Sequence, residues 1–502
     1  MKKINQIIGL CLVSAAVLTA CAQAAPSATK VETPKVSFKA GTYTAEGKGN
    51  NGPVKVEAVF SDSKIESISV KEHTETAGLT DGAIKSVPSK IVELQSLDID
   101  VVTGATYTSR AIKYAVADCV KQAGGEENAL LKVDLDRPSE SEKYFKSAVD
   151  AIEKPKAVNG VIEIKSYDEL KKALGYYDYI VNTSTKEGKF MFVDGSASDG
   201  DTIKMMNDIS AEGDKDNPKS KDGSDKMDVV TGATLVVTNN VTIDGNGKTI
   251  KGQGYPTFMF AGKLEDFENG AIEATLKKVT IDDAAYNAKI GGAVFVVGAA
   301  TLNMEDSTIS NSKAGSAKLA FNGGGAVYLN SHGFKPEEGK AILNAKNCTF
   351  TGNETANGGG AALMSLNGHI NVYNSRFSGN KALSEMGVGG AIALRGESSL
   401  LVEGSEIVSN EAAVAGGGIY IFDGESLFKG TGIITSDNKA VIKNSTIKDN
   451  KAAHGADVAY GRFYSDTFKG NKEKNGLDIS EGNKIGDYKD LTFTTIERTV
   501  LK

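Results

Sequence analysis

Residues 389–422 read GGAIALRGESSLLVEGSEIVSNEAAVAGGGIYIF, and this stretch decides the fold of most of the chain. It begins with a glycine pair and a short apolar run, continues through a second phrase that ends in asparagine, and then returns to glycines before another apolar run. Both phrases recur elsewhere, so the chain repeats one supersecondary unit. Short apolar runs bounded by glycine and asparagine favour β-strands separated by tight turns.

The two phrases alternate beyond residue 230. The glycine phrase occurs as GGAVFV at 291–296, GGAVYL at 324–329, GGAALM at 359–364, GGAIAL at 389–394 and GGIYI at 417–421. The other phrase ends at Asn353, Asn380, Asn410 and Asn450. Repeats of about 27–40 residues built in this way predict a right-handed parallel β-helix, in which each coil stacks on the previous one. We expect the asparagines to stack in turns as structural residues rather than as ligands.

The repeats resemble the GGA-aliphatic and FxxN repeats of chlamydial polymorphic outer-membrane proteins and, more loosely, pectin-lyase-like folds. This resemblance extends over residues 230–460. Many β-helices are polysaccharide lyases or hydrolases, and their chemistry needs acid pairs, or calcium carboxylates with a basic residue, on successive strands. A β-helix enzyme should therefore show such groups on its outward face.

The predicted outward side chains contain no such carboxylates. With Val327, Ala362, Ile392 and Ile419 taken as inward, the residues one position later form an outward column of Phe295, Tyr328, Leu363, Ala393 and Tyr420. Two interpretations of this column remain, namely a stacking ladder covered by a loop, and a strip that binds a sugar or a protein partner. The acidic stretch at 212–228 is interpreted either as a cation site or as a solvated loop.

Composition supports a β-rich chain and excludes one class of function. The chain has 502 residues, too many for one ordinary core, with 56 glycines, 9 prolines and no tryptophan. The net charge is -7 and the isoelectric point about 5.5. Because lysines and acidic residues are interleaved, no basic stripe for nucleic acid is present in the sequence.

The amino terminus predicts export. Lys2 and Lys3 precede an apolar run at 7–17 that is too short to span a bilayer as a finished helix. The following LTAC at 18–21 resembles a bacterial lipobox, which implies that Cys21 is the lipid anchor. The alternative is an ordinary signal peptide in which Cys21 is incidental. We expect a protein anchored to the bacterial cell membrane and facing outside the cytoplasm, with the choice of inner or outer membrane open.

The predicted organisation has five segments. They are a signal peptide and lipobox at 1–21, a flexible tether at 22–36, a first domain at 37–125, a linker at 126–160, and the β-helix with an N-terminal capping helix at 161–495. The linker is charged and patternless apart from a helix around 144–152. Ser166 and Glu169 are spaced as a capping box that opens a helix at 168–174.

The first domain is predicted to be α+β. Alternating apolar residues predict strands at 41–45, 54–60 and 65–70, which form a small antiparallel sheet. From Ser109 the apolar spacing becomes helical, and Gly124 with Gly125 ends the helix. The apolar face of this helix carries Ile112, Ala115, Val116, Cys119 and Val120, and its opposite face carries Arg110, Lys113 and Lys121.

Two cysteines remain after the segment at 1–21. Cys119 and Cys348 fall in different predicted domains, so a disulfide framework is not expected. We expect both to be small buried residues.

Residues 100–108, DVVTGATYT, closely resemble the flavinylation motif D-x-x-S/T-G-A-S/T-x-S/T of the FMN-binding domain family. That family includes the NqrC and RnfG subunits of membrane redox pumps. Upstream, HTETAG at 73–78 is similar to the family's H-x-E-T-P-G, with Ala77 in place of the proline. The helix downstream follows in the family's order, so the resemblance spans residues 39–125.

The resemblance implies FMN bound through a phosphoester to Thr108, placed there from FAD by a separate Mg-dependent flavin transferase. Gly104 and Ala105 remove side-chain bulk where backbone approaches a phosphate, and threonine hydroxyls with the next helix's amino terminus supply donors. The implied cofactor-binding residues are Asp100, Thr103, Gly104, Ala105, Thr106, Thr108, His73, Glu75 and Thr76. The alternative for residues 73–76 is a solvated loop before a short helix at 82–86 capped by Asp81. No catalytic residue and no metal site are predicted.

A near-copy of the motif, DVVTGATLV, occupies residues 228–236. Its last residue, Val236, has no hydroxyl, and neither the upstream His-x-Glu-Thr nor a following amphipathic helix is present. We therefore expect no flavin on this copy. It runs instead into VTIDGNGK at 241–248, a common β-helix opening.

Three functions remain in competition. The first is an electron carrier, in which a membrane redox complex reduces the FMN and the tethered domain passes electrons to an extracellular acceptor. The second is a surface adhesin or glycan-binding protein with an accessory flavin domain. The third, a β-helix polysaccharide lyase or hydrolase, is the least supported. The intact Thr108 favours the first, and whether the chain is an enzyme stays open.

Overall fold

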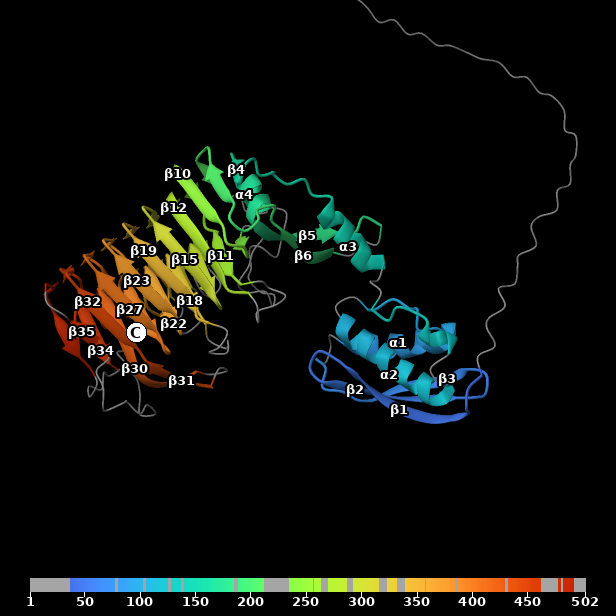
Figure 1. The fold of residues 1–502 in the computed structure, drawn as a ribbon. Coiled ribbons are helices and arrows are strands. Elements are labelled where there is room, and N and C mark those ends of the chain that lie inside the picture. The colour runs from blue at the N-terminus through green and yellow to red at the C-terminus, as the bar shows by residue number, and fades with distance from the viewer. Residues whose placement is uncertain are drawn as a thin grey trace, which may run out of the picture. The chain divides into compact units, whose positions relative to one another are not determined.

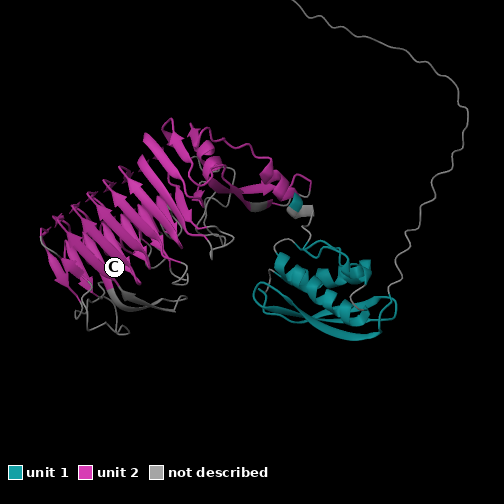
Figure 2. Ribbon diagram, in the orientation of Figure 1, with its two compact units in different colours: residues 1–143 teal, residues 144–502 magenta. Residues whose placement is uncertain are grey.

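The computed structural model resolves two compact units, residues 1–143 and residues 144–502 (Figure 2). The residues that it describes are 37–76, 80–102, 105–124, 128–136, 140–184, 188–211, 234–255, 257–262, 270–286, 292–315, 323–331, 339–356, 358–384, 387–428, 432–461, 477–479 and 482–491. The predicted signal peptide, Cys21, the tether and the acidic stretch at 212–228 lie outside these residues. In the described part of the chain, no helix is long and apolar enough to cross a membrane.

The first unit is an antiparallel sheet covered on one face by two helices (Figure 1). The strands are β1 (Gly41–Lys48), β2 (Pro53–Phe60) and β3 (Ile65–Glu72), paired in the order β1-β2-β3. The helices are α1 (Asp81–Leu94) and α2 (Thr106–Gly124), and the short helix η1 (Ala129–Leu131) follows. The predicted α+β architecture and its three strands are confirmed.

Both helices are longer than the sequence predicts. Helix α2 begins at Thr106 instead of Ser109, because Ser109 already donates its backbone N–H to the Ala105 carbonyl at 2.8 Å. Helix α1 extends to Leu94 instead of residue 86, and its N-cap is Thr80, not Asp81. Burial of Val87 and Ile91 explains the extension, since they continue the apolar face past Pro88.

Lys113 was expected on the polar face of α2 and is instead buried, at 1% exposure. Its ammonium group donates to the Ile99 carbonyl at 3.2 Å, so the charge has a partner inside the protein. The buried face of α2 therefore includes a polar residue beside its apolar residues. Cys119 lies on the same helix and is fully buried, as predicted, and burial raises the pKa of its thiol to about 11.

The helix α3 (Glu140–Asp150) crosses the boundary between the two units and lies within the stretch expected as a linker with a helix at 144–152. The predicted cap of Ser166 is confirmed at α4 (Tyr167–Leu174), but the side chain of Glu169 bonds to Lys165 instead of closing the capping box on Ser166. The Ser166 hydroxyl accepts from the Glu169 N–H at 3.2 Å, and Glu169 accepts from the Lys165 N–H at 2.5 Å. A hairpin of β5 (Gly175–Val181) and β6 (Gly188–Asp194) follows α4.

From β4 onward the unit is a parallel β-helix, as predicted, with coils that run through three sheets (Figure 1). The first sheet contains β4 (Val161–Ile164), β7 (Thr202–Met205), β8 (Ile209–Ser210), β10 (Thr242–Lys251), β12 (Ile272–Asp282), β15 (Ala300–Glu305), β16 (Thr308–Ser310), β19 (Ile342–Lys346), β20 (Thr349–Thr351), β23 (His369–Tyr373), β24 (Arg376–Ser378), β27 (Ser399–Glu403), β28 (Glu406–Val408), β32 (Lys439–Lys443), β33 (Thr446–Lys448), β35 (Leu477–Ile479) and β36 (Lys484–Ile485). The second contains β9 (Leu235–Val237), β11 (Phe258–Ala261), β14 (Val294–Val297), β18 (Val327–Asn330), β22 (Leu363–Leu366), β26 (Ile392–Arg395), β30 (Ile419–Phe428), β34 (Val458–Gly461) and β37 (Tyr488–Asp490), with β31 (Gly432–Asp437) paired to β30. The third contains β13 (Ala285–Tyr286), β17 (Lys313–Ala314), β21 (Glu354–Thr355), β25 (Lys381–Ala382) and β29 (Glu411–Ala412).

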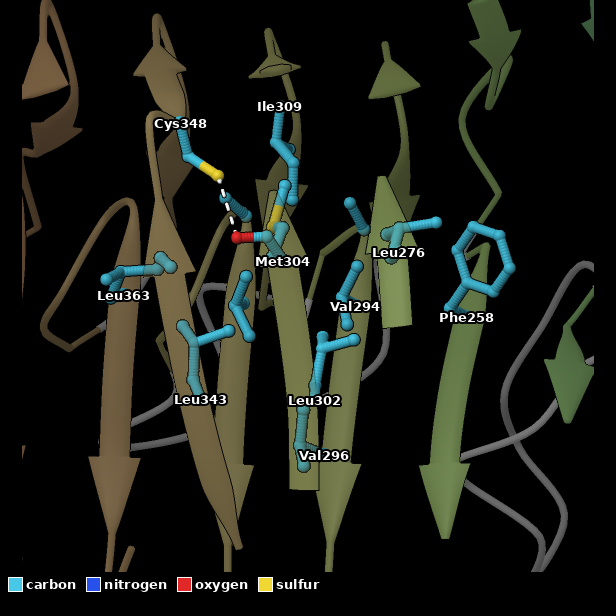
Figure 3. Packing of buried hydrophobic residues seen from close by; sticks show 14 of the residues in the cluster. Phe258, Leu276, Val294, Val296, Leu302, Met304, Ile309, Leu343, Cys348 and Leu363 are labelled. Carbon is cyan, nitrogen blue, oxygen red and sulfur yellow. Dashed lines mark hydrogen bonds between the residues drawn. The ribbon is translucent and has the colours of Figure 1, made fainter. Parts of the chain in front are cut away.

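The interior of the coils is a continuous apolar core, shown in part in Figure 3. Cys348 points into it and its sulfur contacts the Met304 carbonyl at 3.3 Å. Serines occupy the corresponding turn in neighbouring coils, where Ser375 accepts from the Cys348 N–H at 2.9 Å and Ser405 accepts from the Ser375 N–H at 3.0 Å. The cysteine is thus a small buried residue, as predicted, and burial raises the pKa of its thiol to about 12.

The repeated asparagines form a directional ladder, which confirms their structural role. Asn353 donates its backbone N–H and its Nδ2 to the Asn380 Oδ1, both at 3.0 Å. Asn380 makes the same pair of bonds to Asn410, and Asn410 makes them to Asn450. At the end, Asn450 donates both groups to the Oδ1 of the buried Asp457. Each coil therefore supplies the acceptor that the coil before it needs.

The outward column differs from the prediction at one coil. Tyr328 pairs in register with Met364, so Met364 stands in the column and Leu363 faces the core. The glycine phrases at 324–329 and 359–364 are aligned one residue apart from what their sequences suggest, because Ala361 occupies the position that Gly325 has in the preceding coil. The corrected column is Phe295, Tyr328, Met364, Ala393 and Tyr420. All five side chains are buried, which favours the stacking ladder over an exposed binding strip.

Replacing a mid-ladder asparagine should destabilise the β-helix. Asn380→Ala leaves the two donors of Asn353 without their acceptor. It also removes the side-chain donor of the Phe350 carbonyl and one of the two donors of the Asn410 Oδ1, which keeps the backbone N–H of residue 380. We expect the free energy of unfolding to fall by about 2–4 kcal/mol, measured by denaturant titration. The matched control is Asn371→Ala, whose half-buried amide donates to Asn344 on the outer face, with an expected loss below about 1 kcal/mol. Equal losses would contradict the structural role of the ladder.

Candidate functional site

Thr108, the predicted flavin acceptor, is the third residue of α2. Its side chain is buried, with 1% exposure, and its hydroxyl donates to the Oε2 of Glu75. Glu75 follows β3 and is itself 7% exposed. The structure therefore brings together two of the predicted residues that lie 33 positions apart.

Glu75 also connects Thr108 to the turn between β1 and β2. Its Oε1 accepts from the Asn51 backbone N–H at 2.7 Å. The Asn51 amide donates to Thr76 Oγ1 at 3.0 Å, and Thr74 Oγ1 donates to the Asn51 carbonyl at 3.0 Å. We call these contacts between residues 49–52 and 73–76 the clasp. The clasp holds the Glu75 carboxylate over the first turn of α2.

The charge on Glu75 is stabilised by its donors. Burial alone raises the pKa of the Glu75 carboxyl, but the hydrogen bonds from Thr108 and from the backbone N–H groups of Asn51 and Asn50 outweigh it, with a smaller contribution from His73. The net result is a pKa below the ordinary value for glutamate. Glu75 is accordingly an anion at neutral pH.

Two glycines allow α2 and Glu75 to approach the hairpin. A Cβ on Gly47 would lie 1.9 Å from the Ala111 carbonyl oxygen, so the helix backbone rests directly on β1. A Cβ on Gly49 would lie 2.6 Å from the Glu75 Oε1. No larger residue fits at either position without moving backbone or the carboxylate.

Two grooves meet along the end of β1 beside this site. One has a volume of about 500 Å³ and is lined by residues 46–50, 52 and 53. The other has a volume of about 480 Å³ and is lined by residues 46–48 together with Tyr107, Arg110, Tyr114 and Asp136. Tyr107 is 64% exposed and Tyr114 is 41% exposed, so α2 presents two aromatic rings to the second groove.

The loop before α2 is fixed by the helix itself. Ser109 Oγ accepts from the Val102 N–H at 3.0 Å and donates to the Ala105 carbonyl at 2.8 Å. Ala105 is buried, and Asp100 and Thr106 are half-buried. Thr103 and Gly104 lie outside the described residues.

The remaining predicted site residues are His73 and Thr76, and both are exposed. Thr76 belongs to the clasp through Asn51, and its carbonyl accepts from the Thr80 hydroxyl at 3.0 Å. Sequence reasoning missed Asn51, Tyr107 and Arg110. The glycine and asparagine cluster at 49–52 was the available signal for the turn, whereas the exposure of Tyr107 depends on where α2 begins.

The residues present fit a phosphate-linked flavin. Thr108 offers a hydroxyl in the first turn of α2, and the amino terminus of a helix favours a phosphate through its backbone N–H groups and the helix dipole. The grooves have the size usual for cofactor sites.

The near-copy of the motif has a different structure where it is described. Thr234 precedes β9, in which Val236 is buried and pairs with Met259. The two copies share the sequence DVVTGAT, at 100–106 and 228–234. The first copy leads into helix α2, whereas the second leads into strand β9. Residues 228–233 lie outside the described residues.

In the described part of the β-helix, no group of three or more histidine, cysteine or acidic side chains is placed to hold a metal ion. The second-sheet column carries apolar and aromatic side chains, all buried.

Substitution of Gly47 tests the close approach of α2 to the hairpin. We expect Gly47→Ala to lower the free energy of unfolding of the first unit by about 1–3 kcal/mol, because its Cβ would overlap the Ala111 carbonyl. Denaturant titration followed by circular dichroism gives the measurement. Gly82→Ala is the control, since its Cβ would find only Val102 Cγ1 at 3.8 Å, and alanine there favours the helix. If the two variants are equally stable, the packing described here is wrong.

Three relatives match short parts of the chain. NADH:acrylate oxidoreductase of Vibrio harveyi is 36% identical over 117 residues, 23% of this chain and 12% of that protein. An uncharacterised protein of Treponema pallidum is 37% identical over 85 residues, 17% of this chain and 24% of that protein. Urocanate reductase of Eggerthella lenta is 37% identical over 86 residues, 17% of this chain and 14% of that protein. The chain thus spans less than two thirds of the length of each relative.

Among solved structures, a mutant of Bacillus subtilis pectate lyase aligns with 68% of this chain and 81% of its own, at 10% identity and a TM-score of 0.24. A pectate lyase bound to a hexasaccharide aligns with 68% of this chain and 83% of its own, at 10% identity and a TM-score of 0.21. Two family models match the sequence, the FMN-binding domain over residues 49–121 and the right handed beta helix region over residues 322–493. The chain therefore joins an FMN-binding domain to a right-handed β-helix.

Proposed function

We propose that this chain is an exported, lipid-anchored electron carrier whose FMN is bound covalently to Thr108 through a phosphoester. The observation that carries the proposal is the position of the Thr108 hydroxyl, which lies in the first turn of α2 and beside a glycine-rich turn that borders a groove. The near-copy at 228–236 supplies the contrast, because it has valine where the hydroxyl is needed.

The groups around Thr108 suit a phosphodiester. The amino terminus of α2 provides backbone donors for the phosphate oxygens. Three glycines, Gly47, Gly49 and Gly52, line the 500 Å³ groove together with Asn50. In the adjoining groove, Tyr107 and Tyr114 offer ring faces to a planar aromatic group, and Arg110 lies one helical turn from each of them. We propose that His73, Glu75 and Thr76 border the same cofactor.

Bound FMN would supply reversible acceptance and release of electrons. The relatives that are named as reductases, NADH:acrylate oxidoreductase and urocanate reductase, support a redox role for the domain. We propose that a membrane redox complex is the electron donor and that an extracytoplasmic acceptor or redox protein receives the electrons. A covalent bond suits this location, since a cofactor lost outside the cell could not be replaced from the cytosolic pool.

The sequence at 1–21 supports the location. A basic start, a short apolar run and LTAC before Cys21 are the features of a lipoprotein signal. The tether at 22–36 would separate the FMN-binding domain from the membrane surface. The β-helix would serve as a scaffold or as a binding domain for a glycan or protein.

Flavin attachment is tested by coexpression with a bacterial flavin transferase, followed by denaturing electrophoresis. We expect flavin fluorescence on the wild-type band and none on the band of Thr108→Ala, because the ester oxygen is removed. Mass spectrometry should place the added FMN on the peptide that contains Thr108.

The matched control is Thr80→Ala, which removes another buried threonine hydroxyl of the same domain, bonded to the Thr76 carbonyl. This variant should keep its fluorescence. A dark wild-type band, or a fluorescent Thr108→Ala band, would overturn the proposed attachment.

A further inference from the structure

We propose that Glu75 is the general base for the modification of Thr108, so that the chain supplies a catalytic group for its own flavinylation. The proposal rests on the proposed function, in which Thr108 is the acceptor. It assigns to Glu75 a role beyond bordering the cofactor, namely removal of the proton that the acceptor oxygen must lose.

The geometry already joins the two groups. The Thr108 hydroxyl donates a hydrogen bond to the Glu75 Oε2, so base and nucleophile are in direct contact before any substrate arrives. Exposure of 1% for Thr108 and 7% for Glu75 keeps bulk water from competing for that proton. Activation of a hydroxyl by an adjacent base in a protected site is the usual arrangement for nucleophilic catalysis.

The carboxylate is also fixed in its orientation. Its Oε1 accepts from the Asn51 N–H at 2.7 Å, which leaves Oε2 directed at Thr108. Gly49 provides the space for this arrangement, because a Cβ there would lie 2.6 Å from Oε1. His73 is the neighbouring titratable group whose charge acts on Glu75, and it favours the ionised form. Glu75 thus has the orientation and the charge that a base needs.

The step balances as a phosphoryl transfer. The Thr108 Oγ1 forms a bond to the phosphorus of the FMN half of FAD, and the pyrophosphate P–O bond breaks. AMP leaves with the electron pair of that bond. The Thr108 proton passes to Glu75 Oε2, and no oxidant or reductant is consumed. Glu75 becomes neutral in this step, which avoids placing a carboxylate beside the new phosphodiester.

The test uses the full chain, isolated without flavin, with FAD, Mg²⁺ and a bacterial flavin transferase. Covalent flavin on the denatured band is followed with time. General bases typically contribute 10²–10⁴-fold to a rate, so we expect Glu75→Ala and Glu75→Gln to slow the initial transfer by about 10²-fold or more. Added formate should restore transfer to Glu75→Ala, where it can occupy the vacated space, and should not restore Glu75→Gln, where the amide fills that space.

The control is Asn51→Ala, which removes the amide bond to Thr76 and keeps the backbone N–H that holds Glu75. A change of only a few fold is expected, because the clasp is weakened while the base remains. Melting temperatures of all variants check that the domain is folded. If Glu75→Gln is unstable, Glu75→Ala with and without formate decides.

The outcomes separate the two proposals. Absence of flavin on the wild type overturns the proposed attachment itself. Flavin on the wild type and none on Thr108→Ala, together with transfer to Glu75→Gln at the wild-type rate, leaves the attachment standing and overturns the role of Glu75. Slow transfer to Glu75→Ala that formate does not restore also overturns it, because the carboxylate would then act only in holding the structure.

Discussion

The stability of the β-helix depends on hydrogen-bond partners for the polar groups buried in its turns. Each coil buries backbone N–H and carbonyl groups in its turns, and a buried group without a partner weakens the fold more than a formed bond strengthens it. The asparagine ladder meets this need by passing an acceptor from coil to coil, beginning at the Ser312 N–H and ending at Asp457. Between Ser312 and Asp457 the ladder adds one hydrogen-bonded position per coil to the alignment that the strand pairs already give.

Buried polar groups must also be paired in the FMN-binding domain, where the pairing positions the Glu75 carboxylate beside Thr108. Glu75 is a buried anion, and it is tolerated because Thr108 and the Asn51 backbone donate to it. Those donors are in reach only because Gly47 and Gly49 let α2 and the hairpin come close. The contact between Glu75 and Thr108, and with it the chemistry proposed for Thr108, therefore depends on two positions that carry no side chain at all.

The sequence predicted the repeats, the order of the two domains and the three strands of the first domain, because periodicity and turn residues are local signals. Its errors fall where longer-range contacts decide. Lys113 can be buried because the Ile99 carbonyl accepts a hydrogen bond from its ammonium group, and no helical pattern reveals that partner. The shift from Leu363 to Met364 follows from one alanine in place of a glycine. The contact between Thr108 and Glu75 crosses 33 residues, so the motif indicated both residues but not their hydrogen bond.

The asparagine ladder has a donor at one end and an acceptor at the other. This direction affects how the β-helix can change its length in evolution. Asparagine both accepts from one neighbour and donates to the next, so a coil inserted with its own asparagine leaves every group paired. Only the terminal positions, a backbone donor at Ser312 and the carboxylate of Asp457, are unlike the rest. Duplication or loss of a whole coil therefore leaves the hydrogen bonds of the ladder paired, whereas insertion or deletion of a few residues within a coil breaks them. Selection can lengthen or shorten this solenoid in steps of one repeat.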